Sequence, residues 1–249
     1  MEITFSTCER IGEGKLIWNV VFGAAMQKVL RIPIGCKSLD EMLSGGIETD
    51  TITEIFGEAG SGKTNICLML AKNVVLSGKR VMYIDTEGIS AERLEQICGK
   101  DTEKIVREIL IARCYSLEEQ QAMVEEAAKK AKKENVGLVI LDSGTVFYRI
   151  NIGMEEEAGE RQSLAGMINA LSKLARVEKI PVVITNQVYM DVKKGSFEPI
   201  GGAMLQHNAK IIIRLEKLAE GKRRAVLLKH RSLAEGREAL FTITQNGLE

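Results

Sequence analysis

The sequence has no cysteine pair, no long apolar run and no excess of charge of either sign. Its five cysteines form no C-x-x-C pair, and an odd number in 249 residues argues against a disulfide framework or a zinc site. The apolar runs 136–141 and 180–185 are far shorter than the roughly 20 residues of a membrane span. Basic and acidic residues both number 34, so no global field attracts DNA or a membrane. We predict a cytoplasmic protein that binds anions only through local patches.

From Leu39 onward, short β-branched runs alternate with longer helical patterns, which is typical of a parallel sheet with crossover helices. The predicted strands cover residues 50–56, 80–85, 107–113, 136–142 and 181–186. The predicted helices cover residues 63–78, 90–99, 117–134 and 156–179. A polar loop at 188–202 precedes three β-rich segments, 209–215, 224–230 and 239–244, which are expected to pair antiparallel. The predicted fold class is α/β, with a mostly parallel twisted sheet, helices on both faces and C-terminal antiparallel strands.

The length of the chain favours a single large domain. Residues 31–249 are predicted to form one core domain, because a chain of this size holds one α/β domain and at most a short appendage. Residues 1–30 contain the only Trp and show no sustained period, so we predict an N-terminal arm or extension there. Met26 is an alternative start, which leaves open whether residues 1–25 belong to the native protein.

The stretch GEAGSGKT at 57–64 fits the G-x-x-x-x-G-K-[ST] pattern of a phosphate-binding loop. A strand is predicted before it and a helix after it, so backbone N–H groups near 60–64 form an anion cradle that the helix dipole strengthens. Lys63 is expected to reach the β- and γ-phosphates, and Thr64 to ligate Mg²⁺. The residues predicted to bind the nucleotide here are Gly57, Glu58, Ala59, Gly60, Ser61, Gly62, Lys63, Thr64 and Asn65. The alternative is a chance pattern in a glycine-bearing turn.

Polar side chains also end other predicted strands, at the edge where ligands collect in open α/β sheets. Asp142 ends the apolar stretch LVILD and is the candidate second magnesium ligand. Glu87 follows the strand after the loop helix and is the candidate general base. Asn186 and Gln187 end a further strand, where a side-chain amide can sense a γ-phosphate. Taken singly, each is also explained as a polar strand end or, for Glu87, as an acid at a helix N-terminus.

Together, a series of short motifs resembles the RecA superfamily, in its archaeal and eukaryal recombinase branch. The motifs occur in the family order between about residue 33 and the C-terminus: GCKSLDEML, GGIET, TEIFGEAGSGKT, YIDTEG, LVILDS, ERQ, ITNQV and IGG. The resemblance implies a RecA-like P-loop ATPase core that uses ATP and Mg²⁺ and acts on single-stranded DNA in homologous recombination. It implies catalytic roles for Lys63, Glu87 and Gln187: Glu87 activates water, and Gln187 couples the nucleotide to a DNA-binding loop. It also implies that Arg93 lies against the adenine.

Departures from the full recombinases narrow the resemblance. The roughly 30 residues before the core are too few for the helix-hairpin-helix domain of that branch. The loop after Gln187 is shorter, and Ala203 replaces a histidine near the γ-phosphate. The proline-bearing cap near the C-terminus is replaced by Lys229, His230 and Arg231. These features resemble the archaeal paralogues of the recombinase, and imply slow turnover and an accessory role beside the main recombinase, RadA, and a Holliday-junction resolvase.

Contact with single-stranded or junction DNA is predicted in the segments that follow the Asp142 and Gln187 strands. The cations predicted to contact DNA are Arg149, Lys193, Lys194, Lys229, His230 and Arg231. Aromatic side chains beside them, at Tyr148, Tyr189 and Phe197, supply stacking surfaces. If Lys229 and Arg231 lie on one strand, they share a face and can approach phosphates, including those of a neighbouring subunit. A second cluster at Lys217, Lys222, Arg223 and Arg224 extends this footprint or simply forms an exposed turn.

Several interpretations of assembly and activity remain open. Phe22 and Ala25 match the F-x-x-A peptide by which recombinases of this branch link subunits through an added strand, so a homodimer is one interpretation and a chance match of this short motif is the other. One alternative function is an active strand-exchange recombinase. Another is a RecA-like signalling ATPase or phosphotransferase without a DNA role, and a last one is an ATP-gated adaptor whose hydrolysis is incidental.

Overall fold

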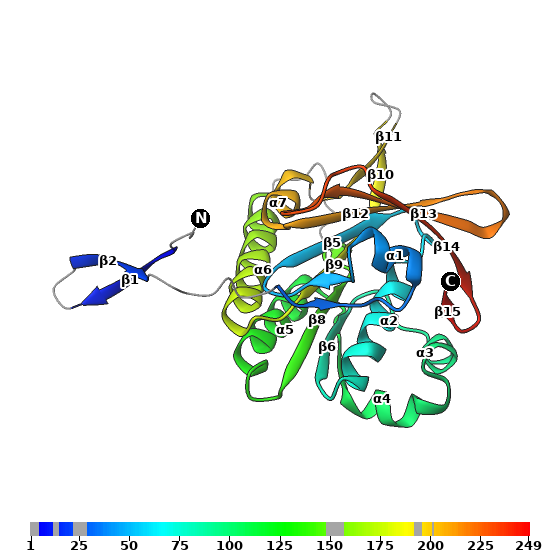
Figure 1. Cartoon of the computed structure of the whole chain (residues 1–249), viewed down its shortest axis with the longest axis horizontal. Coiled ribbons are helices and arrows are strands. Elements are labelled where there is room, and N and C mark those ends of the chain that lie inside the picture. The colour runs from blue at the N-terminus through cyan, green and yellow to red at the C-terminus, as the bar shows by residue number, and fades with distance from the viewer. Residues whose placement is uncertain (1–4, 12–14, 22–28, 148–156, 192–195, 201) are drawn as a thin grey trace. The chain divides into compact units, whose positions relative to one another are not determined.

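The computed structural model describes residues 5–11, 15–21, 29–147, 157–191, 196–200 and 202–249 (Figure 1). The chain divides into two compact units, residues 1–30 and residues 31–249. In the first unit, β1 (Phe5–Ile11) and β2 (Lys15–Val21) form an antiparallel hairpin. None of the described helices is long and apolar enough to cross a membrane.

The second unit contains a nine-stranded sheet whose order is β15-β14-β13-β12-β5-β9-β8-β6-β7. Its parallel half consists of β5 (Ile52–Gly57), β6 (Arg80–Asp85), β7 (Ile109–Arg113), β8 (Val136–Asp142) and β9 (Val182–Asn186). The remaining strands are β12 (Ile211–Lys217), β13 (Lys222–Lys229), β14 (Glu238–Thr244) and β15 (Gly247–Leu248). β12 pairs parallel to β5, and from there the strands pair antiparallel to the edge. The predicted mostly parallel sheet with C-terminal antiparallel strands is confirmed.

Helices cover both faces of this sheet, as predicted (Figure 1). The elements of one face are α1 (Lys37–Met42), α2 (Lys63–Leu76), α3 (Ala91–Cys98) and α4 (Thr102–Glu108). Those of the other face are α5 (Leu117–Lys130), α6 (Glu157–Glu178) and α7 (Gly202–Asn208). The buried apolar residues form two clusters, one with each set of helices, because the side chains of every strand alternate between the faces. A short ladder of β3 (Arg31–Ile32) and β4 (Ile47–Glu48) lies outside the main sheet.

Local sequence explains where the main elements begin. β8 is buried along its whole length, which fits its continuous apolar run in the middle of a parallel sheet. Ser90 and Ser116 precede α3 and α5, and each hydroxyl accepts a hydrogen bond from a first-turn amide, as N-cap residues do.

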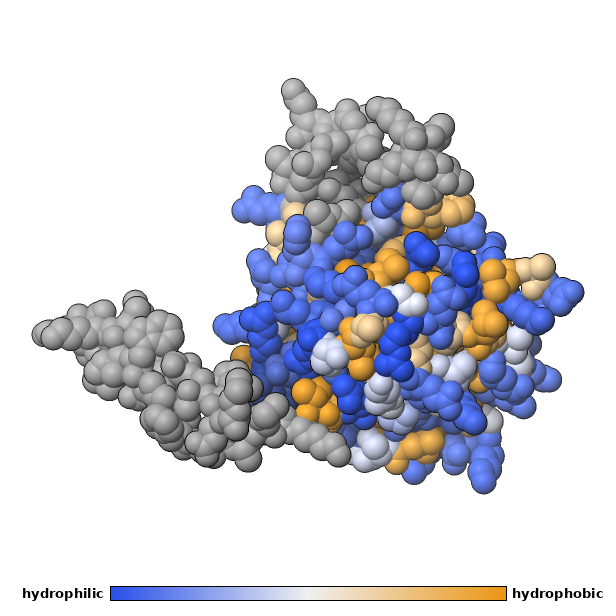
Figure 2. Space-filling view, turned by 45° about the horizontal axis from the view of Figure 1, so that its top comes forward, coloured by the Kyte–Doolittle hydropathy of each residue, from blue (hydrophilic) through white to orange (hydrophobic). Residues whose placement is uncertain are grey.

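Exposed apolar side chains occur in separate patches among hydrophilic ones on the face that Figure 2 shows.

The prediction of a polar loop at 188–202 is wrong, because two strands lie within this range. β10 (Val188–Asp191) and β11 (Ser196–Pro199) form an antiparallel hairpin in which Met190 pairs with Phe197. The segments V-Y-M-D and S-F-E-P alternate apolar and polar residues, which is a strand signal that the surrounding Gly and Lys residues obscured. A two-stranded hairpin therefore begins directly after Gln187.

Candidate nucleotide-binding site

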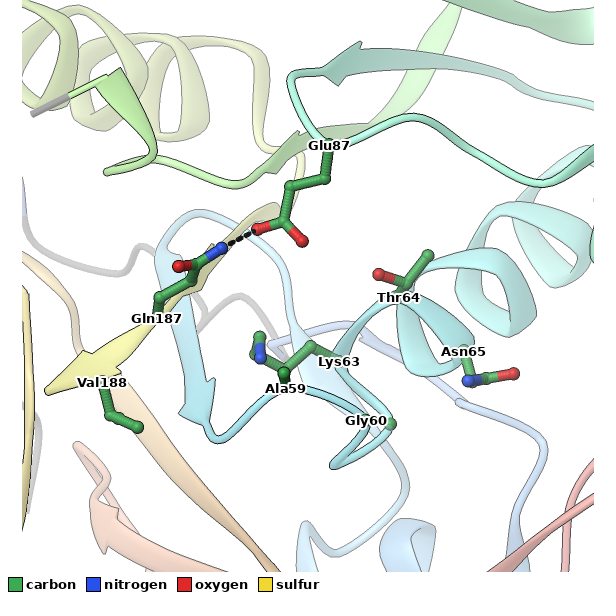
Figure 3. Close-up of a pocket in the computed structure, with 9 residues that line it drawn as sticks. Ala59, Gly60, Lys63, Thr64, Asn65, Glu87, Gln187 and Val188 are labelled. Atoms are coloured by element: carbon green, nitrogen blue, oxygen red, sulfur yellow. Dashed lines mark hydrogen bonds between the residues drawn. The ribbon is translucent and has the colours of Figure 1, made fainter. Parts of the chain in front are cut away.

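A cavity of about 260 Å³ opens at the carboxyl edge of the parallel strands (Figure 3). β5 ends in the phosphate loop, and β6 and β9 end next to the residues that line the opposite wall. The lining residues are Ala59, Gly60, Gly62, Lys63, Thr64, Asn65, Glu87, Gln187 and Val188. Residues that follow the ends of three different strands therefore line one cavity, as is typical of ligand sites at the carboxyl edge of α/β sheets.

The loop 57–64 has the backbone geometry of an anion cradle. Gly62 is the N-cap of α2 with φ 107°, and no side chain caps the helix, so the first-turn amides are left for a ligand. A Cβ at Gly57 would lie 2.4 Å from the carbonyl oxygen of Leu215, so only glycine permits this approach of the loop to β12. The residues present therefore fit a bound phosphate chain.

Lys63 is buried at the floor of the cavity, with 7% of its surface exposed. Its Nζ donates hydrogen bonds to the carbonyl oxygens of Gly57 (2.8 Å) and Glu58 (3.1 Å). Burial lowers the pKa of Lys63, while the nearby carboxylates of Glu87 and Asp142 oppose the change. A desolvated cation held by two loop carbonyls is suited to exchange these neutral acceptors for a charged phosphate.

Asp142 lies buried behind the cavity, and its carboxylate is fixed in orientation. Tyr83 donates from Oη to Oδ2 at 2.6 Å, and the Thr185 hydroxyl donates to Oδ1. The Thr64 side chain is a third hydrogen-bond partner. Burial raises the pKa of Asp142, and these hydrogen bonds counteract it. Thr64 and Asp142 thus lie together, which fits Mg²⁺ held by one or two protein oxygens plus phosphates rather than by a protein cage.

Glu87 and Gln187 point toward each other on the wall of the cavity opposite the phosphate loop (Figure 3). Gln187 donates from Nε2 to Oε1 of Glu87 at 2.7 Å. The loop that carries Glu87 is organised by Asp85, which accepts hydrogen bonds from the backbone amides of Gly88 (2.8 Å) and Ile89 (2.9 Å). Sequence reasoning gave Asp85 little weight, although an Asp followed by a turn is a known signal for such amide capping.

Arg93 does not line the cavity, but contacts a residue that does. Its Nε donates to Oδ1 of Asn65 at 2.6 Å, and its Nη atoms donate to the carbonyl oxygens of Gln245 (3.0 Å) and Gly247 (3.2 Å). The guanidinium therefore links α2 to the C-terminal strand pair. Stacking of Arg93 on an adenine stays a prediction.

Arg223 makes a contact that sequence reasoning did not anticipate. Its Nε donates to the carbonyl oxygen of Gly60 at 3.1 Å, so β13 reaches the tip of the phosphate loop. Its neighbours in the predicted basic footprint form ion pairs: Arg224 with Glu216 (2.5 Å) and Lys222 with Glu220 (3.5 Å). No local pattern marks Arg223, because the contact depends on the order of strands in the sheet.

The predicted face shared by Lys229 and Arg231 is wrong, because β13 ends at Lys229. Lys229 donates from Nζ to the carbonyl oxygen of Gln206 at 2.7 Å, and burial lowers its pKa. Arg231 forms an ion pair with the buried carboxylate of Glu48. The prediction assumed that the alternation of side chains along β13 continues to Arg231, two residues past the end of the strand.

The side chain of His230 has no exposed surface, so its predicted contact with DNA is wrong in this structure. Its Nδ1 accepts hydrogen bonds from the backbone amides of Ser232 (3.1 Å) and Leu233 (3.0 Å). Burial lowers its pKa, with Arg31 and Arg231 acting in the same direction and Glu48 against them. His230 therefore organises the turn after β13.

Arg231 also lines a cavity of about 480 Å³ beside Asp50, Thr51 and Ile52, where β5 begins. The phosphate loop follows the other end of this strand, about 17 Å away by strand geometry. Within one chain, Arg231 therefore lies at the opposite edge of the sheet from the nucleotide cavity. A contact with phosphates of a neighbouring subunit stays a prediction.

Other predicted contacts lie outside the described residues: Arg149, Lys193, Lys194, Tyr148, Phe22 and Ala25. On the hairpin after Gln187, Tyr189 is 49% exposed and Phe197 is 43% exposed. Aromatic rings at such exposure are available for stacking on bases.

The sequence model of the Rad51 family matches residues 25–249. The chain belongs to the Rad51 family. This membership places it among the RecA-like ATPases, which use ATP and Mg²⁺, and it confirms the resemblance drawn from the motifs. The phosphate loop, Asp142, Glu87 and Gln187 all lie within the matched range.

Known proteins are similar to this chain over most of its length. The DNA repair and recombination protein RadB of Methanococcoides burtonii is 50% identical over 214 residues, covering 86% of this chain and 95% of that protein. RadB of Archaeoglobus fulgidus is 41% identical over 225 residues, covering 90% of this chain and all of that protein. A crystal structure of the RadB recombinase is similar with a TM-score of 0.76 at 34% identity, covering 88% of this chain and 98% of the other. The RecA-like fold and the resemblance to archaeal recombinase paralogues are confirmed.

Proposed function

We propose that this chain is a DNA-binding accessory protein of homologous recombination and DNA repair that binds ATP and hydrolyses it slowly. The observation that carries the proposal is the hydrogen bond between Glu87 and Gln187, which joins the candidate base to the candidate sensor in the wall of the cavity. Gln187 leads directly into the β10–β11 hairpin, so the sensor is the first residue before a segment with exposed aromatic rings.

In this proposal, each residue around the cavity has a defined task. Lys63 and the first-turn amides of α2 bind the phosphates. Thr64 and Asp142 hold Mg²⁺, which supplies charge neutralisation to the phosphate oxygens when bound. Glu87 orients and deprotonates the attacking water. The donor from Gln187 occupies one oxygen of Glu87 in this conformation, so Gln187 has to turn away before Glu87 is fully available as a base, which supports slow turnover.

The DNA surface is proposed to lie on the segments after β8 and β9. Tyr189 and Phe197 supply stacking surfaces, and Lys193 and Lys194, which lie between β10 and β11 in the sequence, supply charge. Arg149 follows β8 and is proposed to contact the same strand of DNA. The names of the relatives support a role in recombination, and we propose RadA and a Holliday-junction resolvase as protein partners. Residues 31–249 are proposed as the ATPase core and residues 1–30 as an extension.

The proposal is tested by measuring affinity for single-stranded DNA with and without Mg-ATP, beside steady-state hydrolysis with and without DNA. We expect tighter DNA binding with ATP and slow turnover. Pairing of homologous strands by this chain alone would instead show a strand-exchange recombinase. Phosphate transfer to a protein or metabolite without DNA binding would show a phosphotransferase or signalling ATPase.

A further inference from the structure

Asn186, the last residue of β9, is wholly buried, and its side-chain amide joins three separate segments. Its Oδ1 accepts a hydrogen bond from Oγ1 of Thr145 at 2.5 Å. Its Nδ2 donates to Oε1 of Glu54 at 2.9 Å and to the carbonyl oxygen of Ile200 at 2.8 Å. The amide thus uses both of its donors and its acceptor, which fixes its orientation.

The three partners of Asn186 lie at functionally distinct places. Glu54 belongs to β5, the strand that enters the phosphate loop. Thr145 follows the strand that ends at Asp142 and precedes the segment with Arg149. Ile200 follows β11 and so ends the hairpin that begins after Gln187. One amide therefore connects the entry to the phosphate loop with the ends of both proposed DNA-contacting segments.

Consecutive residues hold Ile200 from both sides. The side chain of Asn186 binds the carbonyl oxygen of Ile200, and the carbonyl oxygen of Gln187 accepts from the amide of Ile200 at 3.0 Å. The side chain of Gln187 faces the cavity and Glu87. If Gln187 exchanges Glu87 for a phosphate, any shift of its backbone acts directly on Ile200, because the two residues are hydrogen-bonded, while Asn186 holds the carbonyl oxygen of Ile200 in place.

This polar network is costly to bury, which argues that it has a positioning role. Glu54 is wholly buried, and its Oε2 has no hydrogen-bond partner among the described residues. Burying a carboxyl with an unsatisfied oxygen costs more than packing an apolar side chain of similar volume. Thr53, its neighbour on β5, also has a buried hydroxyl without a partner, but it lies outside the network.

We propose that Asn186 is a positioning residue that anchors the hairpin 188–200 and Thr145 to β5, and so transmits the nucleotide state of Gln187 to the DNA-contacting hairpin. The inference rests on the proposed function, because it assigns the structural link between its two sites. It adds residues that touch neither nucleotide nor DNA. Coupling between sites of this kind commonly changes an affinity by about 5-fold or more.

The test compares Asn186→Ala and Thr145→Val with the matched control Thr53→Val. Thr145→Val removes one hydrogen bond of the network, whereas Thr53→Val removes a buried hydroxyl of the same kind that has no partner. Glu54→Gln keeps the Oε1 acceptor for Asn186, so its hydrogen exchange and its ratio of DNA affinities are expected to match those of the unmodified chain. Urea unfolding first establishes that each variant is folded.

Two measurements then follow: hydrogen exchange of the 188–191 and 196–200 amides upon addition of Mg-ATP, and the ratio of DNA affinities with and without Mg-ATP. In Asn186→Ala and Thr145→Val we expect nucleotide affinity within about 2-fold of the unmodified chain, no ATP-dependent change in exchange, and a DNA ratio near one. If folded Thr145→Val and Asn186→Ala show the same ATP-dependent exchange and the same ratio of DNA affinities as Thr53→Val, this inference is wrong. The proposed function is not affected by that result. If Mg-ATP changes the hydrogen exchange of the unmodified chain but the chain binds no DNA, the proposed function is wrong. The exchange data on the variants then still decide whether Asn186 anchors the hairpin.

Discussion

Glu87 and Gln187 are separated by 100 positions in the sequence, yet their side chains are joined by a hydrogen bond of 2.7 Å at the mouth of the nucleotide cavity. The contact exists because β6 and β9 flank β8 in the sheet, so the residues after their carboxyl ends lie at one edge. It defines a state in which the candidate sensor is bound to the candidate base.

Glu87→Gln is expected to reduce ATP hydrolysis by about 10²-fold or more, because an amide cannot accept the proton of the attacking water. Nucleotide affinity should change little, since Glu87 contacts no phosphate in the proposed arrangement. Steady-state phosphate release and a fluorescent-nucleotide titration measure the two effects. Hydrolysis at half the original rate or more would remove Glu87 from the role of base.

Lys63→Ala is expected to weaken ATP binding by about 10-fold or more, because it removes a buried charge-assisted donor to the phosphates. Lys72→Ala is the control, since Lys72 lies on the same helix and donates to the carbonyl oxygen of Ile97 instead. Isothermal titration with Mg-ATP compares the variants. Equal losses at both positions would indicate damage to α2 rather than a phosphate contact.

Arg223→Gln is expected to weaken nucleotide affinity by about 3- to 10-fold, because the loop loses the donor that holds Gly60 in place. Arg224→Gln is a matched control one residue away, because Arg224 forms ion pairs with Glu216 and Glu238 rather than a hydrogen bond with the loop among the described residues. The same titration distinguishes them. If the two variants bind ATP equally well, the contact between β13 and the loop has no part in nucleotide binding.

Glu54→Gln is expected to change how stability depends on pH. Burial raises the pKa of Glu54 from 4.5 to about 7, although the Asn186 hydrogen bond and the charge of Lys229 oppose it. Between these values the folded chain binds more protons than the unfolded chain, so the free energy of unfolding falls as pH rises. The contribution of Glu54 to the free energy of unfolding is fully present below pH 4.5 and is lost above pH 7. The difference is on the order of 3 kcal/mol.

Urea unfolding of the unmodified chain and of Glu54→Gln at pH 5 and pH 8 measures this effect as a difference of differences, which cancels the titration of other groups. The variant should gain stability relative to the unmodified chain at pH 8 but not at pH 5. Glu95→Gln, at an exposed carboxyl, serves as the control. An identical pH dependence in both chains would show that Glu54 does not titrate in this range.

Replacing both Lys193 and Lys194 by Ala is expected to weaken binding to single-stranded DNA and to make it less dependent on salt. Each lost phosphate contact lowers the slope of log affinity against log salt by about 0.7, so the double variant should lose about 1.4. Fluorescence anisotropy between low and physiological salt gives both slopes. An unchanged slope would place the DNA contacts elsewhere.

Much of the nucleotide site follows from contiguous sequence. The loop 57–64 lies between a strand and a helix whose periods are visible in the residues, and both are found within about two residues of the predicted bounds. Asp142 ends a strand whose bounds the sequence predicts without error. Such features are local, because a helix or a parallel strand is encoded in the spacing of its own apolar residues.

What the sequence by itself determined is therefore the α/β class, the phosphate loop and the strand ends that carry Glu87, Asp142 and Gln187. Only the tertiary structure decided that Arg223 contacts Gly60, that the side chain of His230 is buried and that Asn186 joins Glu54, Thr145 and Ile200. These contacts depend on which strands are neighbours, on their register and on where a strand ends. That information is held in the packing of the whole sheet, and no local period of the sequence contains it.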